Sequence, residues 1–482
     1  MNLNDFKVNK NLSAIKQVKL VKKYIDRNVN KTVSAKQIKF ISDIFKIPKS
    51  VIKFEFKKYL SANYNFKHGK FNKKMQFKKV ITSLIYYYAN LIIFLILSKH
   101  IKFKKKIKII FDEIFSQNEL ERSEIFLKNA NSYKIISKIK NKKNLNIVNY
   151  PNFYGCSQNY LFKNFLNFFI KIPYFVLKSS FNDKMNYFPF YIVVMKINVR
   201  YETLFKQYRA RILLQERPYS TSAIKNYLFK KYGGHKTCCF QRILFNLAHT
   251  SFYINADVLF SLGKMSAKTI ALTGSKVSKI VPLGSFSYYS KWIKSKKIKT
   301  KKYDIVYLNV NTVPAYAISN KYLKNYYMQL NWLRLISLEN PHLKILLKHH
   351  RNNTYHDPEE LKIIKGTNIE RISSDTFADR FNNSYGYAIN SKIRLSWAST
   401  MIYELLGHNY QSFFLDPKHE NSEFLQNHSF NKKYRIKNYK DFKKKINDII
   451  FKQRKANVIN PDHYCLNSKA FFKRFKNFLD KF

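Results

Sequence analysis

The chain has 482 residues, enough for two or three domains. Hydrophobic residues make up 45% of it and aromatic residues 17%, and this apolar content excludes global disorder. The 89 Lys and Arg against 29 Asp and Glu give a formal charge of +60, which admits nucleic acid, an anionic membrane or an anionic substrate as partner. Lys, Asn, Ile, Phe and Tyr are abundant together while Gly and Pro are scarce, so a low-GC coding bias explains most of this charge. We therefore attach functional meaning only to local clusters of charged residues.

The cysteines indicate a reducing compartment. Cys156, Cys238, Cys239 and Cys465 form no CxxC pair and have no His/Cys spacing typical of zinc. We interpret them as reduced, buried thiols. The first sixteen residues lack the continuous apolar core of a secretory signal. These features predict a cytoplasmic protein.

Residues 1–100 read as a basic helical region. The segment 34–60 holds two amphipathic runs that are separated at Pro48. This spacing resembles a helix-turn-helix, so nucleic-acid binding through the basic N-terminal helices is one hypothesis. A helical appendage explains the same pattern and is favoured, which makes nucleic acid the less favoured partner.

An apolar window follows, from residue 80 to 98, without any charged residue. As a helix it would extend for roughly 28 Å, marginally enough to cross a hydrocarbon core of about 30 Å. Lysines flank both ends and give no orientation for a span. Residues 1–110 contain 27 Lys and Arg against 4 Asp and Glu, with six lysines between 99 and 108. We therefore predict that residues 80–108 attach peripherally to the inner face of the cytoplasmic membrane; a helix buried in an N-terminal bundle is the alternative.

From residue 101 on, short apolar runs alternate with amphipathic segments, which is typical of βαβ units. Helices are expected at 117–130, 159–178 and near 190–207. The predicted strands of this first series are 106–114, 133–137, 144–150, 209–216 and 235–241. We assign 101–250 to an N-terminal Rossmann-like domain.

A second series of the same kind follows. Its helices are expected at 321–339 and 399–408. Its strands are expected at 256–263, 278–285, 303–311, 342–350, 368–373, 389–396 and 410–417. We assign 251–455 to a C-terminal Rossmann-like domain and 456–482 to a helical tail. The predicted fold class is α/β, with two doubly wound Rossmann-like domains that face a cleft and follow the basic helical region.

Parallel sheets bind ligands at the carboxyl ends of their strands, so the residues there are the site candidates. In the second domain a helix that starts with hydroxyl residues offers free N–H groups and a positive dipole end to a phosphate. A glutamate one turn further can accept from sugar or ribose hydroxyls, although an ordinary Ser/Thr helix cap explains the hydroxyls equally well. The candidates for such a phosphate-binding site are His349, His350, Arg351, Ser396, Ser399, Thr400 and Glu404.

Candidates for a catalytic base come from strand ends in the first domain. Transfer to a hydroxyl requires a carboxylate or histidine that takes the proton. Asp112 and Glu113 follow one predicted strand, and Glu216 ends another. Cationic groups such as Arg351 could hold the charge of the leaving phosphate. Since no DxD element with apolar flanks occurs, we expect neither a metal nor a cofactor.

The run 213–417 resembles GT-B-type glycosyltransferases of bacterial surface-polysaccharide synthesis, among them capsule, sialic-acid or Kdo and polyglycerolphosphate transferase-like families. LKHHR (347–351), SWAST (396–400), Glu404 and GHNYQSFFLDP (407–417) carry the resemblance, and 257–285 resembles the opening of that family's second domain. Two features depart from it: Arg242 follows Gln241 where relatives have His-Gly, and Arg351 replaces a proline.

The resemblance implies a metal-independent glycosyltransferase of the cell envelope. It would move a sugar or sugar-phosphate from a nucleotide-activated donor, a nucleotide sugar, to a saccharide or lipid-linked saccharide acceptor. The resemblance also implies that 101–250 binds the acceptor and that 251–455 binds the donor through the phosphate-site candidates named above. The alternative is a scaffold of polysaccharide assembly that kept the fold without the chemistry.

Overall fold

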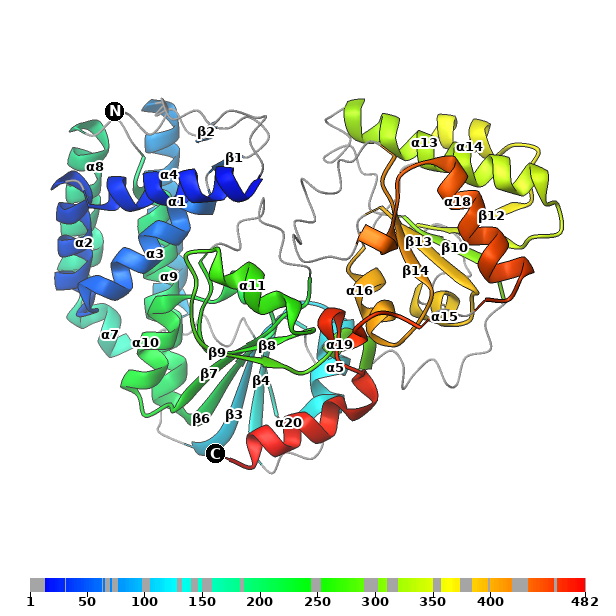
Figure 1. Cartoon of the computed structure of the whole chain (residues 1–482). Helices are drawn as coiled ribbons and strands as arrows, with labels where there is room; N and C mark the ends of the chain where they lie inside the picture. The colour runs from blue at the N-terminus through cyan, green and yellow to red at the C-terminus, as the bar shows by residue number, and fades with distance from the viewer. Residues whose placement is uncertain are drawn as a thin grey trace.

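The computed structural model describes residues 14–481 except 31, 63, 66–69, 72–76, 98–104, 128–131, 140–145, 150–157, 183–185, 244–252, 290–301, 310–319, 350–356, 373–383, 398, 418–431 and 455–456. A helical N-terminal part is followed by a seven-stranded sheet and a six-stranded sheet, each with its own helices (Figure 1). The apolar runs of the sequence therefore fold into two α/β domains.

The N-terminal part consists of α1 (Ala14–Val29), α2 (Thr32–Phe45), α3 (Lys49–Ala62), a short antiparallel pair β1 (Tyr64–Asn65) and β2 (Lys70–Phe71), and α4 (Phe77–Ile96). Ile38, Ile41 and Phe45 lie on one face of α2 and are buried, as helical spacing requires. Glu55 of α3 accepts hydrogen bonds from Ser222 Oγ at 3.0 Å and Ala223 N at 2.8 Å. These contacts dock α3 onto the first α/β domain.

The geometry of α3 bears on the nucleic-acid hypothesis. A recognition helix needs an exposed face that can enter the major groove. Every residue of α3 from Val51 to Ser61 is buried or half-buried, and Lys57 pairs with Asp26 at 2.5 Å. This segment has no free face for DNA, so the helical appendage is the better interpretation of the 34–60 pattern.

The first sheet has the order β5-β4-β3-β6-β7-β8-β9, and all its strands are parallel. Its strands are β3 (Lys105–Ile114), β4 (Tyr133–Ser137), β5 (Ile147–Asn149), β6 (Tyr208–Gln215), β7 (Lys236–Phe240), β8 (Asn255–Ser261) and β9 (Lys276–Pro282). Its helical segments are α5 (Gln117–Leu127), α7 (Gln158–Lys163), the π-helical turn η2 (Asn167–Lys171), α8 (Ile172–Asn182), α9 (Phe188–Gln207), the 3-10 turn η3 (Pro218–Ser220), α10 (Ala223–Lys231) and α11 (Met265–Ala271).

Helices cover both faces of this sheet (Figure 1). Successive strand side chains point to opposite faces, which separates two cores. Ile110 and Leu213 pack with α9, α10 and the N-terminal helices. Phe111 and Leu214 pack on the other face, with α5 and residues of the C-terminal tail. The face on which a strand-end residue lies therefore decides its surroundings.

The second sheet has the order β12-β11-β10-β13-β14-β15 and is also fully parallel. Its strands are β10 (Ile305–Leu308), β11 (Ile345–Lys348), β12 (Ile369–Ile372), β13 (Ile393–Ser396), β14 (Ser412–Leu415) and β15 (Arg435–Ile436). Its helical segments are α13 (Asn320–Glu339), α14 (Pro358–Ile364), α15 (Ser384–Ile389), α16 (Thr400–Gly407), η5 (Lys432–Tyr434), α18 (Tyr439–Ile446) and η6 (Asn447–Phe451). In both sheets the first strand lies in the middle and the order reverses there, which is doubly wound topology. This part of the predicted fold class is confirmed, and the cleft stays a prediction.

The boundary between the domains differs from the prediction at residue 250. Strands β8 and β9 pair with β7 in the first sheet. Their apolar runs have the same pattern as the strands of the second sheet. Only their pairing with β7 shows that they belong to the first sheet. The segment 257–285 therefore completes the first domain rather than opening the second, whose first strand is β10.

The C-terminal tail returns to the first domain through α19 (Pro461–Tyr464), η7 (Ser468–Ala470) and α20 (Phe471–Leu479). Phe471 and Phe475 are buried in the same core as Phe111. The tail passes α16 closely, because a Cβ on Gly407 would lie 2.1 Å from the carbonyl oxygen of Cys465. The tail thus ties the second domain to the first sheet.

Candidate functional site

Doubly wound sheets bind ligands where the strand order reverses, at the carboxyl ends of the two central strands. In the first sheet this place lies between β3 and β6, and in the second between β10 and β13. The residues there are Asp112 and Glu113, Gln215 and Glu216, Leu308 and Asn309, and Ser396. Several sequence candidates thus belong to the two places where the topology favours a ligand.

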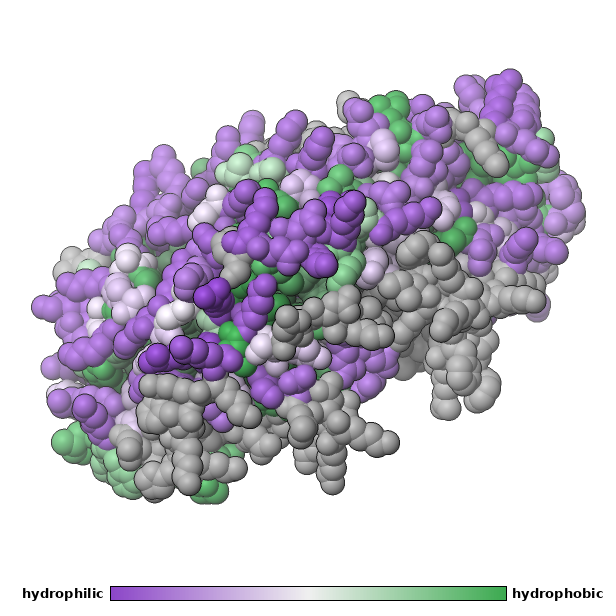
Figure 2. All heavy atoms as spheres, turned by 90° about the horizontal axis from the view of Figure 1, so that it is seen from below, coloured by the Kyte–Doolittle hydropathy of each residue, from purple (hydrophilic) through white to green (hydrophobic). Residues whose placement is uncertain are grey.

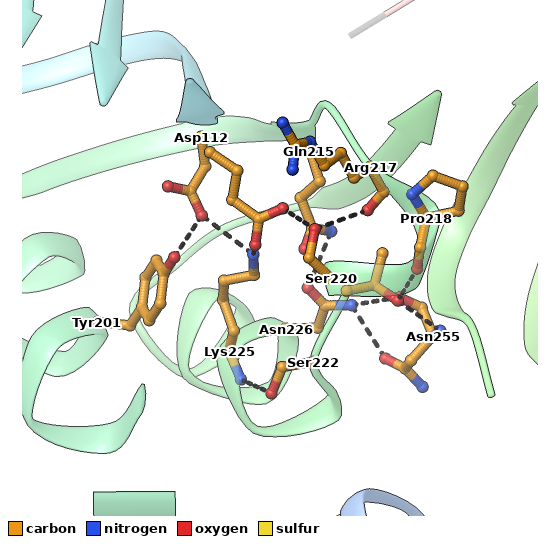
Figure 3. A network of polar contacts seen from close by, with 12 residues as sticks. Asp112, Tyr201, Gln215, Arg217, Pro218, Ser220, Ser222, Lys225, Asn226 and Asn255 are labelled. Atoms are coloured by element: carbon orange, nitrogen blue, oxygen red, sulfur yellow. Dashed lines mark hydrogen bonds and ion pairs between the residues drawn. The ribbon is translucent and has the colours of Figure 1, made fainter. Parts of the chain in front are cut away.

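Asp112 and Glu113 form a buried ion cluster with Lys225 of α10 (Figure 3). The Lys225 ammonium lies 3.0 Å from Asp112 Oδ2 and 2.7 Å from Glu113 Oε1. Tyr201 Oη donates to Asp112 at 2.5 Å, and Ser220 Oγ donates to Glu113. These partners come from α9, η3 and α10. Both carboxylates are thus engaged by buried protein groups, which disfavours both as the predicted base.

Glu113 has φ of 73°, a left-handed conformation that non-glycine residues rarely adopt. The pairing of β3 with β4 shifts by a bulge between Phe111 and Ile114. Burial raises the pKa of Glu113, while Lys225 acts to lower it. The contact with Lys225 therefore stabilises both the left-handed backbone conformation of Glu113 and its buried charge.

Glu216 lies on the opposite face of the sheet. It directly follows the last residue of β6, Gln215, which hydrogen-bonds Asn226 of α10 at 3.2 Å. The alternation of side chains turns Glu216 toward α5, where Arg122 Nη2 lies 3.0 Å from Glu216 Oε1. Arg242, after β7, lies 3.2 Å from the same oxygen.

Glu119 of α5 extends this group. Arg217 and Arg242 each approach its Oε1 to 2.6 Å. We call Glu119, Arg122, Glu216, Arg217 and Arg242 the junction cluster. It holds three guanidinium groups against two carboxylates, and Arg217 and Arg242 keep 25% and 18% of their side chains exposed. The cluster therefore offers positive charge to an anionic ligand.

The two carboxyl groups of the junction cluster differ in pKa. Burial raises the pKa of Glu216 to about 7, although Arg242 and Arg122 act to lower it. Burial also acts to raise the pKa of Glu119, but hydrogen bonds from Arg217 and from Phe115 N outweigh it and hold the pKa at about 2. A carboxyl that titrates near neutral pH beside one that stays ionised is the arrangement that acid–base chemistry uses.

The raised pKa of Glu216 predicts a pH dependence of stability. The folded protein keeps this proton up to about pH 7, whereas the unfolded chain releases it near the ordinary value of 4.5. Stability is therefore lost as pH rises through this window, by about 3 kcal/mol for this group. Urea unfolding at the two ends of the window should show that Glu216→Gln removes this loss. The pKa of His408 is lowered to about 4, so this group changes stability with the opposite sign in an overlapping pH range. Because wild type and variant both contain His408, its contribution cancels in the comparison. Identical pH profiles would contradict the shift.

In the second domain, Ser396, Ser399 and Thr400 lie together at the end of β13. Ser396 Oγ donates to the carbonyl of Leu308 at 2.7 Å and accepts from Ser399 N at 3.2 Å. Ser399 is the N-cap of α16, and its Oγ accepts from Met401 N at 3.2 Å. The structure has the helix start that was predicted from the sequence. It also has the ordinary Ser/Thr helix cap that was the alternative explanation of these hydroxyl residues. Its positive end lies beside the end of β10.

His349 lies at the end of β11, on the other side of β10. Two strand spacings, about 10 Å, separate it from the end of β13. Its Nδ1 lies 3.2 Å from Asn309 Nδ2 and its Nε2 lies 2.7 Å from Glu360 Oε1. Arg371 and Tyr326 also donate to Glu360, at 2.6 Å and 2.5 Å. Both ring nitrogens of His349 thus have hydrogen-bond partners within the second domain. His349 would therefore not contact a sugar donor itself but would position Asn309 for that contact.

Asn309 was not among the sequence candidates. It follows β10 at the reversal of strand order, is 7% exposed, and its Oδ1 has no hydrogen-bond partner among the described residues. The strand itself was predicted, but only the strand order identifies β10 as the central strand.

Glu404 connects the two domains. Ser285, which follows β9, and Tyr385 of α15 both donate to its carboxylate, Tyr385 at 2.7 Å. Burial raises the pKa of Glu404, while these hydrogen bonds and the charges of Arg122 and Arg242 act to lower it. Arg122 also donates to Ser287 at 3.2 Å. The junction cluster thus acts electrostatically on the second domain, and Glu404 reaches a ligand only if one of its protein donors is displaced.

Two predicted donor ligands, His350 and Arg351, lie outside the described residues. Their role stays a prediction. Among the residues that the structure describes, no group of three or more His, Cys, Asp or Glu is arranged to hold a metal ion.

Glu119 and Arg122 were not among the residues predicted from the sequence either. Ser116 and Glu119 have the spacing of a capping box, and the structure shows its bonds: Ser116 N donates to Glu119 Oε2 at 3.2 Å, and Glu119 N to Ser116 Oγ at 3.4 Å. Arg122 follows Glu119 by three residues, hence on the same side of α5. The capping signature could have located this helix start at the carboxyl end of β3.

No protein-family model matches the chain, and no curated protein matches it. Solved structures with a similar arrangement include the wall teichoic acid polymerase TagF soaked with CDPG, at 14% identity and a TM-score of 0.43 over 84% of this chain and 98% of that one. The UDP-GlcNAc 2-epimerase from Neisseria meningitidis bound to UDP-GlcNAc has 11% identity and a TM-score of 0.46, over 78% of this chain and 100% of that one. S. aureus MnaA with UDP has 12% identity and a TM-score of 0.45, over 78% and 96%. At these values the likeness carries no conclusion about activity.

Proposed function

We propose that the chain is a glycosyltransferase that moves a sugar or sugar-phosphate from a nucleotide-activated donor to a surface-polysaccharide acceptor. The observation that carries this proposal is the junction cluster at the end of the first sheet, where Glu216 with a pKa of about 7 lies among three arginines. Transfer to a hydroxyl needs a proton acceptor with a pKa near the working pH. Departure of a nucleotide needs cations near its phosphates.

Each part of the proposed site has one role. Glu216 takes the proton of the acceptor hydroxyl through its Oε2, which has no hydrogen-bond partner among the described residues. Its side chain is 0% exposed, so this role requires that acceptor binding opens the junction cluster. Arg217 and Arg242, the more exposed guanidiniums of the cluster, balance the phosphate charge together with the N-terminus of α16. Asn309 offers a buried amide to the donor at the centre of the second sheet. Arg351 is proposed as a further phosphate ligand, and a saccharide or lipid-linked saccharide as the acceptor.

A nucleotide screen tests the donor part of this proposal. A ligand that binds only the folded state at a hundredfold excess over its Kd stabilises it by about 2.7 kcal/mol. We therefore expect one class of nucleotide or nucleotide sugar to raise the melting temperature. The nucleobase of the stabilising compound then identifies the class of donor. Single-stranded oligonucleotides serve as the control for charge alone. Stabilisation by oligonucleotides and by no nucleotide sugar would contradict the proposal. Donor binding without any release of nucleotide in the presence of acceptors would favour the scaffold.

A further inference from the structure

Helix α4 exposes an apolar stripe although its other face is buried. Val80, Tyr87, Leu91 and Phe94 are fully enclosed by the N-terminal part. The outward side carries Phe77, Ile85, Tyr86, Ile92, Ile93 and Ile96, and Ile96 is 75% exposed. Positions 85, 92, 93 and 96 follow helical spacing, so they form one continuous stripe. Among the described residues, α4 is also the one helix long and apolar enough to cross a membrane, with 28% of its apolar window buried.

A second stripe lies beside it. Residues 158–182, which form α7, η2 and α8, expose Phe162, Phe165, Leu166, Ile170, Tyr174 and Phe181, and Tyr174 is 67% exposed. Positions 162, 166, 170 and 174 recur every four residues, which places them on one side of the helical run.

The two helical segments pack against each other. Tyr87 Oη donates to the carbonyl of Phe168 at 2.8 Å, and Tyr88 Oη to that of Phe169 at 3.0 Å. At the other end the rings of Phe77 and Phe181 are 5.7 Å apart. The start of α4 therefore meets the end of α8, and the segments run antiparallel. We call their outward residues the α4–α8 surface. Figure 2 shows that the face seen from below is mostly hydrophilic, with apolar side chains scattered over it.

The charges around this surface identify what covers it. Neither Phe77–Ile96 nor 158–182 contains an Asp or Glu. Lys78, Lys79, Lys163, Lys171 and Lys178 are exposed on the same segments. Lys196 of α9 donates to Tyr86 Oη at 3.1 Å. Two copies of the chain facing each other would bring these cations together without any acidic partner. An anionic bilayer complements both the apolar stripes and their lysines.

We propose that the α4–α8 surface docks the protein in the plane of an anionic lipid bilayer, with both stripes inserted to the depth of the headgroups. The buried face of α4 stays packed on the N-terminal part, so the helix lies in the interface and does not span. The exposed Tyr86 and Tyr174 place hydroxyl-bearing rings at the headgroup level. This inference does not depend on the proposed function. It extends the attachment expected from residues 80–108 to a second segment that the sequence did not suggest.

Flotation with lipid vesicles tests this. The full chain should float with vesicles of phosphatidylcholine and phosphatidylglycerol, much less with phosphatidylcholine alone, and high salt should release it. Two paired variants, Ile92→Glu with Ile96→Glu and Leu166→Glu with Ile170→Glu, should each lower partitioning by about tenfold or more. The matched control is Leu335→Glu with Leu338→Glu on α13, where the two leucines are 39% and 46% exposed. It should float like the wild type.

Unchanged melting temperatures establish that the variants are folded. Normal flotation of the folded 166/170 variant would overturn the two-segment surface. A dimer in light scattering that the same variants convert to monomers, without any vesicle binding, would show that a second copy covers the surface and would also overturn the proposal. Resistance to high salt and alkaline extraction would indicate a span and overturn docking in the plane.

Discussion

Replacement of Glu216 by Gln is expected to lower nucleotide release from the donor by about 10²–10⁴, with little effect on donor affinity. The amide keeps the shape of the carboxyl but cannot accept a proton. Glu216 is the one sequence-predicted carboxylate that lies with Arg122 on the α5 face of the sheet, next to groups that act on Glu404. Turnover is measured with the nucleotide sugar that gives the largest thermal stabilisation.

The matched control for this prediction is Asp112→Asn, measured at a temperature where the variant is folded. Asp112 was an equal candidate from the sequence but lies against Lys225 on the opposite face. We expect near-normal turnover from it. Full activity of Glu216→Gln, or a loss confined to Asp112→Asn, would show that the wrong carboxylate was assigned.

Replacement of Lys225 by Met is expected to destabilise the fold by about 3–5 kcal/mol. Lys225 is 1% exposed and pairs with two carboxylates that are 0% and 8% exposed on their side chains. Its removal takes from both buried carboxylates the ammonium group that hydrogen-bonds them. Urea unfolding of wild type and variant measures the difference in free energy.

A triple variant separates charge from packing. Asp112→Asn and Glu113→Gln in the Lys225→Met background remove the uncompensated charges, and we expect most of the lost stability to return. If the triple variant is no more stable than Lys225→Met alone, the cost is one of packing, and the ion cluster is not what holds this strand end.

The strands were predictable because parallel strands buried on both faces are nearly continuous apolar runs. HLKILLKHH and YDIVYLNVN yielded β11 and β10 in this way. The domain boundary was not predictable from the same signal. Strands β8 and β9 have equally apolar runs, and their membership in the first sheet depends on pairing with β7, which no local pattern encodes.

The sequence predicted where the site residues lie along the chain. It did not predict on which face of the sheet each side chain lies. The carboxyl-end rule selected Asp112, Glu113 and Glu216 alike, since all three follow apolar strands. Their separation onto two faces depends on side-chain alternation, the bulge near Glu113 and the helix that covers each face. His349 shows the same limit: its place at a strand end was foreseen, but its partners Asn309 and Glu360 come from other elements.

Photoaffinity labelling with an azido analogue of the stabilising nucleotide sugar, followed by peptide mapping, tests directly whether the donor binds between the two sheets. A donor held between the two reversal points should label peptides from both sheets, around residues 214–217 or 241–243 and around 396–404. Unmodified donor should compete with the label. Competable labelling confined to the N-terminal helices, or labelling that no nucleotide sugar reduces, would contradict a donor site at the junction of the two domains.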